Sequence, residues 1–100
     1  MAEHPLATLE KIDPEMMRRL KDLDPFIYGP GAIPPKYKIL MAMAFDAAAG
    51  ADMGVRALAQ RATREGASAQ EIAEALRVAF HLSGVGCLYA ASAGLKDILG

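Results

Sequence analysis

Residues 51–82, ADMGVRALAQRATREGASAQEIAEALRVAFHL, decide the fold of this chain. Helix-forming residues dominate the stretch on both sides of Gly66, a residue that commonly ends a helix. Ser68 and Glu71 then have the spacing of a capping box, in which each side chain pairs with a backbone amide of the other residue. The stretch therefore predicts two consecutive helices joined by a short turn at Gly66.

Similar start and stop signals lie on either side of this stretch. Asp13 suits an N-cap with Pro14 at the first helical position, and Asp24-Pro25 predicts the end or a bend of that helix. Gly50 is a plausible residue just past the end of the next helix. The predicted helices cover about 13–24, 35–49, 52–65, 69–82 and 87–99.

The spacing of apolar residues predicts which helix faces form the core. In the fourth helix these residues are Ile72, Leu76, Ala79 and Phe80, and in the last helix they are Leu88, Ala91, Leu95 and Ile98. Ala90 and Gly94 form a pair of small residues four positions apart, which predicts close approach of another helix.

The composition is that of an all-α protein. The 100 residues are 53% apolar and only 6% aromatic, with no tryptophan, and β-branched residues are few. The length fits one domain. We expect a single-domain helical bundle over residues 13–100, preceded by a weakly ordered N-terminal segment, residues 1–12, with one short turn.

Charge and cysteine content argue against several kinds of partner. The formal net charge is −1 with no basic face, so we expect no nucleic acid. The longest apolar run, 39–45, is far too short to span a membrane. Cys87 is the single cysteine, so it has no partner for an intramolecular disulfide. No cysteine and histidine residues have the spacing of metal ligands, and we expect no metal and no cofactor. We expect a cytoplasmic protein.

The amount of apolar sequence predicts self-association. A bundle of this length leaves much of its surface exposed. Methionine and alanine faces on the second and last helices exceed what one thin core covers, and identical neighbours are the simplest cover. We therefore expect a homo-oligomer, with room for a small-molecule ligand at a seam between subunits.

The stretch KYKILMAMAFDAAAGADMGVRALAQRATREGASAQEIAEALRVAFHLSGVGCLYAASAGL (36–95) resembles the carboxymuconolactone decarboxylase and alkyl hydroperoxidase D-like family. The resemblance covers roughly residues 33–98, and its most specific part is a helix ending in a Gly-Ala-Ser turn followed by QEIAEALRVAFHLSGV. It implies an all-helical bundle of the alkyl hydroperoxidase D type, which usually forms trimers or hexamers.

The resemblance also shows that the family's reactive residues are missing from this chain. Members with redox activity carry a C-x-x-C motif with a histidine four residues later and a glutamate one helix earlier. Those cysteines fall on Ala51 and Gly54, the histidine on Leu58 and the glutamate near Ile39. The decarboxylase members use a glutamate and the same histidine, which fall on Gly54 and Leu58. Any chemistry must therefore come from other side chains.

Asp46 is the first candidate for that chemistry. It shares a helical stripe with Ile39 and Met43, which predicts partial burial. It also lies near the C-terminal end of its helix, where the dipole disfavours negative charge. A turn at Gly50 predicts Arg56 as the opposing cation. Asp46 is then either part of a structural ion pair or a proton donor and acceptor at a small pocket.

Four residues complete the candidate set. His81, near the end of the fourth helix, interacts with the helix dipole or forms an acid–base pair with Asp46. Arg56 and Lys38 are candidates for binding an anionic substrate. Cys87, in the first turn of the last helix, is either a small buried hydrophobe or a reactive thiol.

Three functions remain open on the sequence. The first is acid–base chemistry, such as decarboxylation or proton transfer, on a small organic acid or lactone, with Asp46 and His81 as catalytic pair. The second is a non-catalytic, oligomeric binding or scaffold protein. The third is a single-cysteine thiol peroxidase or redox sensor that uses Cys87.

Overall fold

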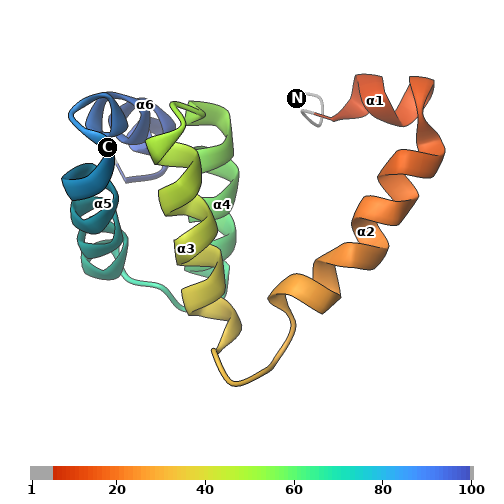
Figure 1. Ribbon diagram of the computed structural model, residues 1–100, viewed down its shortest axis with the longest axis horizontal. Coiled ribbons are helices and arrows are strands. Elements are labelled where there is room, and N and C mark those ends of the chain that lie inside the picture. Colours follow the sequence, from red (N-terminus) through yellow and green to blue (C-terminus); the bar gives the residue numbers. More distant parts are fainter. Residues whose placement is uncertain (1–5, 100) are drawn as a thin grey trace.

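The computed structural model describes residues 6–99, which form six helices and no strand (Figure 1). This confirms the predicted all-α fold. The helices are α1 (Ala7–Ile12), α2 (Pro14–Tyr28), α3 (Pro35–Ala48), α4 (Asp52–Arg64), α5 (Ala69–Ser83) and α6 (Gly86–Leu99). The prediction of a weakly ordered N-terminal segment falls partly on residues 1–5, which lie outside the described residues. Within the described part, its predicted turn is helix α1.

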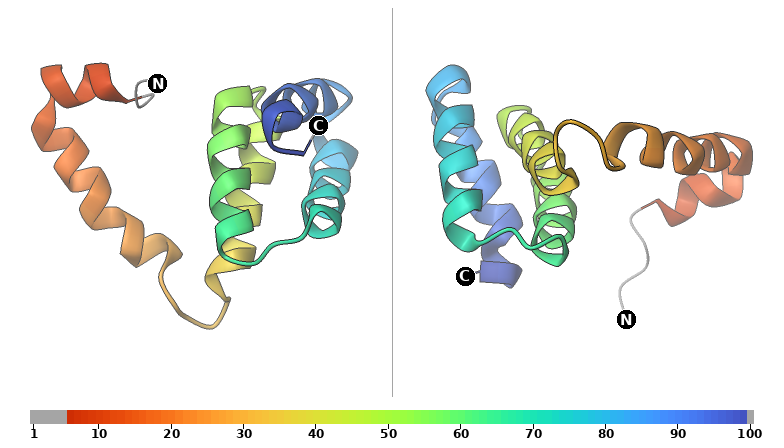
Figure 2. Two further views of the ribbon diagram at one scale, coloured as in Figure 1. Left: turned by 180° about the vertical axis from the view of Figure 1, so that it is seen from behind. Right: turned by 90° about the horizontal axis from the view of Figure 1, so that it is seen from below.

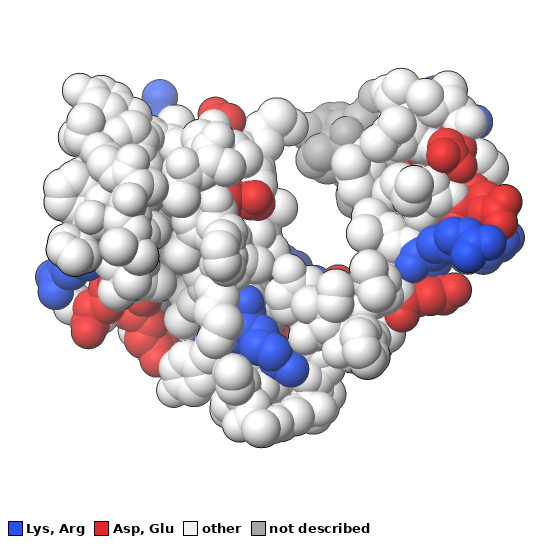
Figure 3. All heavy atoms as spheres, in the orientation of Figure 1, with Lys and Arg blue, Asp and Glu red and all other residues white. Residues whose placement is uncertain are grey.

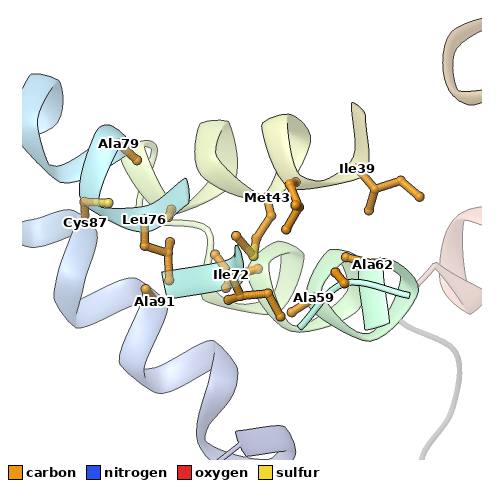
Figure 4. Packing of buried hydrophobic residues seen from close by; sticks show 13 residues of the cluster. Ile39, Met43, Ala59, Ala62, Ile72, Leu76, Ala79, Cys87 and Ala91 are labelled. Carbon is orange, nitrogen blue, oxygen red and sulfur yellow. The ribbon is translucent and has the colours of Figure 1, made fainter. Parts of the chain in front are cut away.

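Helices α3 to α6 pack around one apolar core (Figure 4). Ile39 and Met43 from α3, Val55 from α4 and Ile72 from α5 are the largest side chains that are fully buried. Most of the remaining core is alanine, contributed mainly by α3, α4 and α6. Because alanine is small, the helices can pack closely.

Gly94 confirms the predicted close approach at α6. A Cβ placed on Gly94 would lie 2.6 Å from the backbone oxygen of Asp52 and 2.9 Å from side-chain atoms of Val55. Both atoms belong to α4, and Gly94 itself is buried. The absence of a side chain at this position is therefore what lets α6 lie against α4.

The predicted capping box at α5 is also present. The amide of Glu71 donates a hydrogen bond to Ser68 Oγ at 3.0 Å, and the amide of Ser68 donates to Glu71 Oε1 at 2.9 Å. The hydrogen bond from the Ser68 amide is the main cause that lowers the pKa of Glu71. The second cause is the ammonium of Lys36, whose Nζ lies 3.0 Å from Oε2 of Glu71. Gly66, with a φ of 94°, makes the preceding turn.

Two apolar residues predicted for the core lie at the surface. Phe80 is 41% exposed and Leu88 is 40% exposed. Helix α5 turns Leu76 and Ala79 inward, and Phe80 follows about 100° further around the helix. The inward face of α6 consists of Cys87, Ala90, Ala91 and Gly94, because only small residues fit against α4 and α5.

The helix that contains Pro25 does not end there but continues to Tyr28. Proline removes one backbone donor, and the final turn is still closed by the Gly29 amide, which donates to the carbonyl of Pro25 at 3.0 Å. The helix therefore extends about one turn past the Asp24-Pro25 pair, and the loop starts at Gly29.

Helices α1 and α2 form an arm that leans away from the body, as Figures 1 and 2 show from different sides. The arm is fixed at the C-terminal part of α2. Arg61 of α4 donates two hydrogen bonds to the carboxylate of Asp24, at 2.7 and 2.8 Å, and its guanidinium lies 4.8 Å from the ring centre of Tyr28. This hydrogen bonding with Arg61 lowers the pKa of Asp24.

No helix within residues 6–99 combines the length and the apolar character needed to cross a membrane.

Candidate functional site

A cavity of about 520 Å³ lies where the end of α2 and the following loop meet α3 and α4. Its walls are mostly apolar, and α3 contributes both charged side chains, Lys38 and Asp46. The full lining consists of Ile27, Tyr28, Ile33, Lys38, Met41, Ala42, Phe45, Asp46 and Leu58. Apolar walls with a few polar groups are typical of sites for small molecules.

Asp46 is half-buried, as the sequence predicts. Its carboxylate lies directly against Gly54 of α4, where a Cβ would collide with Oδ2. Within residues 6–99, no hydrogen bond or ion pair involves this carboxylate. Its backbone carbonyl accepts a hydrogen bond from the amide of Ala51 at 2.8 Å, which closes the turn between α3 and α4.

The predicted ion pair between Asp46 and Arg56 is wrong. Arg56 instead pairs with Asp97 of α6, with 3.2 Å between Nη1 and Oδ2. Gly54 and Leu58 are one turn apart on the face of α4 that points at α3. Arg56 is two residues from each, so it lies on the other side of the helix.

Lys38 is the cation that shares the cavity with Asp46. Its ammonium donates a hydrogen bond to the carbonyl of Gly29, which ties α3 to the loop that follows α2. The group is partly buried rather than fully solvated. An ammonium fixed in an apolar cavity attracts an anion more strongly than one on an open surface, because the local dielectric constant is lower.

The cavity lies at the positions where the resemblance places the family's reactive residues. Leu58 forms part of its wall, and Gly54 supports the carboxylate of Asp46. Ala51 is half-buried immediately before α4, and Ile39 is fully buried in the core. Asp46 and Lys38 are therefore the charged groups at a location whose expected reactive residues are replaced by inert ones.

His81 lies away from this cavity. It is exposed near the C-terminal end of α5 and is absent from the cavity lining. The structure therefore does not bring His81 and Asp46 together at one cavity. Cys87 is only 2% exposed and packs in the core with apolar neighbours.

Sequence reasoning missed the contribution of α2 to the site. Tyr28 and Ile27 line the cavity, but the Gly- and Pro-rich composition of residues 28–35 predicted a loop that begins at Tyr28. The Asp24–Arg61 pair that anchors this end of α2 joins residues 37 positions apart, and no local pattern indicates such a pair. The helical spacing of apolar residues in α2, three or four positions apart, is the one sequence signal for a helix that extends to Ile27.

Among the described residues, no group of three or more histidine, cysteine, aspartate or glutamate side chains is arranged to hold a metal ion. The polar side-chain groups in the cavity lining are the carboxylate of Asp46, the ammonium of Lys38 and the phenol of Tyr28.

Comparison with known proteins identifies the family of this chain. No curated protein and no solved structure matches the chain. The model of the carboxymuconolactone decarboxylase family matches residues 14–97, which include α2 as well as the four helices of the body. Because the match extends over far more than half of its residues, the chain belongs to the carboxymuconolactone decarboxylase family.

Proposed function

We propose that this protein performs acid–base chemistry on a small organic acid or lactone in the cavity between α2, α3 and α4. The observation that carries the proposal is the carboxylate of Asp46, which faces the cavity without a protein partner among residues 6–99. A carboxylate that structural pairs leave unoccupied is available to exchange a proton with a ligand. Membership of the carboxymuconolactone decarboxylase family supports this class of reaction.

The two charged groups have complementary roles in this proposal. Asp46 takes the proton from a carbon next to a carbonyl group, and the electron pair of the broken bond moves onto the carbonyl oxygen. Lys38 stabilises the negative charge that develops on that oxygen, or binds the carboxylate of the substrate. In a decarboxylation, carbon dioxide leaves with cleavage of the carbon–carbon bond, and Asp46 in its protonated form returns a proton to the carbon.

This proposal changes the roles that the sequence suggested for two residues. Lys38 takes the anion-binding role that was also considered for Arg56, because Arg56 faces Asp97. His81 has no role in the proposed reaction, because its side chain does not line the cavity.

The test is a proton NMR assay in deuterated water with acetoacetate and an unsubstituted γ-butenolide as probes. We expect faster loss of carbon dioxide or faster incorporation of deuterium with the wild-type protein than in buffer. Asp46→Asn should reduce the rate about 100-fold or more, the usual contribution of a general acid or base. Lys38→Met should weaken binding of acetoacetate.

Asp22→Asn is the matched control, since Asp22 is exposed on α2 and outside the cavity lining. It should leave the rate unchanged. A rate that is the same in buffer and in protein for both probes, or an Asp46→Asn variant with full activity, would contradict the proposal.

A second candidate is a non-catalytic, oligomeric binding or scaffold function. The exposed apolar surface favours it, since Phe26, Phe45 and Leu82 are 86%, 77% and 82% exposed. Under this function Lys38→Met would weaken ligand binding while no probe is converted. We propose self-association in either case, as a trimer or hexamer.

A redox function has less support. Cys87 is buried in the apolar core, so a peroxide has little access to its sulfur. The cytoplasm is the compartment we propose, because this unpaired thiol is consistent with reducing conditions. Hydroperoxide turnover by the wild-type protein that is lost in Cys87→Ala would instead support the redox function.

A further inference from the structure

The surface area of this chain is large for its mass. The accessible surface is 6977 Å², whereas a folded monomer of 10.6 kDa exposes about 5,500 Å². The excess is larger than the roughly 800 Å² that one partner contributes to a standard protein interface. The Cα radius of gyration is 14.0 Å, compared with about 13 Å for a compact chain of this length.

One part of this excess is an apolar stripe along α2. The stripe consists of Met16, Leu20, Leu23 and Ile27, which are 57%, 47%, 47% and 44% exposed. Their spacing of three and four residues places them on one face of the helix. Glu15, Arg18 and Asp22 lie off this stripe, and Figure 3 shows charged side chains along the outer edge of the arm.

A second part is a groove of about 300 Å³ between α3 and α5. Leu82, Phe45 and Val78 are the most exposed of its apolar residues, at 82%, 77% and 66%. The groove contains no charged side chain and is lined by Met41, Ala44, Phe45, Ala48, Val78, Ala79, Leu82 and Ser83. Its apolar lining is of the kind that accepts the apolar stripe of an amphipathic helix.

The stripe and the groove cannot meet within one chain. In Figures 1 and 2, α2 lies on one side of the α3–α4 pair and α5 lies on the other. The end of α2 is held on its side by the hydrogen bonds between Asp24 and Arg61. A second copy of the chain supplies the missing partner for each surface.

We propose that the α2 stripe of one copy lies in the α3–α5 groove of another copy. This inference rests on the self-association in the proposed function and specifies the surfaces that produce it. Each copy donates one helix and accepts one, so the contact buries the two main apolar surfaces of every subunit together. The charged face of α2 stays in water.

The contact also bears on the cavity. Met41 and Phe45 line both the groove and the cavity that holds Asp46. A neighbouring helix in the groove therefore packs against the other side of two cavity residues. We expect assembly to fix the shape of the cavity wall.

Cysteine crosslinking tests which surfaces meet. Two tagged chains, one with Leu23→Cys and one with Leu82→Cys, are expressed together and oxidised. The proposal predicts a disulfide-linked pair that contains both tags. The matched control pairs Arg18→Cys with Leu82→Cys, and it should give little crosslinking because Arg18 lies on the charged face of α2. Equal crosslinking of the two pairs, or none with Leu23→Cys, would overturn the proposal.

Light scattering tests the same contact without new cysteines. Wild-type protein should be oligomeric, and Leu20→Glu or Leu82→Glu should reduce it to monomer while far-ultraviolet circular dichroism still reports helices. Arg18→Glu should remain oligomeric. A monomeric wild type, or oligomers that survive both leucine substitutions, would contradict the inference. Asp46→Asn should keep the wild-type size, so failure of the proposed chemistry and failure of this contact are separate results.

Discussion

Asp46 connects the sequence of this chain to its proposed chemistry. The side chain lies against Gly54, a position at which the family resemblance predicts a reactive group. A glycine there creates space for the carboxylate, and Leu58 one turn later gives the cavity an apolar wall. A charged residue from α3 therefore lies at the place on α4 where the resemblance predicts the reactive groups.

Substitution of Gly54 tests this arrangement. In Gly54→Ala the new methyl group would overlap Oδ2 of Asp46. The carboxylate is the end of a side chain and can rotate away, and alanine favours a helix by up to about 1 kcal/mol over glycine. We expect equal or higher stability in urea unfolding but reduced activity on the probes. Gly86→Ala, which meets no atom within 4 Å, is the control. Full activity in Gly54→Ala would argue against a role of the Asp46 carboxylate in the reaction.

Asp24 gives a prediction about pH. Because Arg61 lowers the pKa of Asp24 in the folded state, this pair stabilises the protein above the ordinary carboxyl pKa of 3.8. The stabilisation is lost as the pH falls below that value and through the lowered pKa. Asp24→Asn should cost about 0.2–1 kcal/mol at neutral pH, since the pair is partly exposed, and nothing at acidic pH. Urea unfolding at both pH values measures the difference.

Asp22→Asn, on the same helix, is the matched control for Asp24→Asn. A cost of the Asp24 substitution that does not change with pH would show that the ion pair has no part in anchoring the arm.

At the scale of elements, the start and stop signals predicted most of the helices. Asp13, Ser68 and Glu71 cap as expected because their partners lie within one turn. The end of α2 was predicted less well. The backbone restriction from Pro25 is local, whereas the contacts that extend the helix to Tyr28 come from α4. The pairing of Arg56 was missed for a similar reason, since its partner is on α6.

Gly94 provides a prediction for the packing of α6 on α4. In Gly94→Ala the new methyl group would meet the backbone oxygen of Asp52, which cannot rotate away. We expect the free energy of unfolding to fall by about 1–3 kcal/mol, a loss typical of overpacking, even though alanine is the better helix former. Urea unfolding measures it, with Gly86→Ala as control. Equal stability of the two variants would show that α6 moves freely relative to α4.

At the scale of the whole molecule, the separation of arm and body is the feature that local sequence patterns did not predict. Met17 is the one buried member of α2, and most of the other apolar residues of this helix are exposed. The sequence predicted an excess of apolar surface on the helices at 35–49 and 87–99. The structure has exposed apolar residues on α3 and α6, and also on α2 and α5. The family match begins at Pro14, so it includes α2 but not α1.

The central claim is that the cavity between α2, α3 and α4 is the functional site. It is tested most directly by methyl NMR while acetoacetate is added to the protein. The account predicts shifts for the methyl groups of Ile27, Ile33, Met41 and Leu58, and their loss in Lys38→Met. Shifts confined to the surroundings of Cys87, or shifts that are unchanged in Lys38→Met, would contradict it.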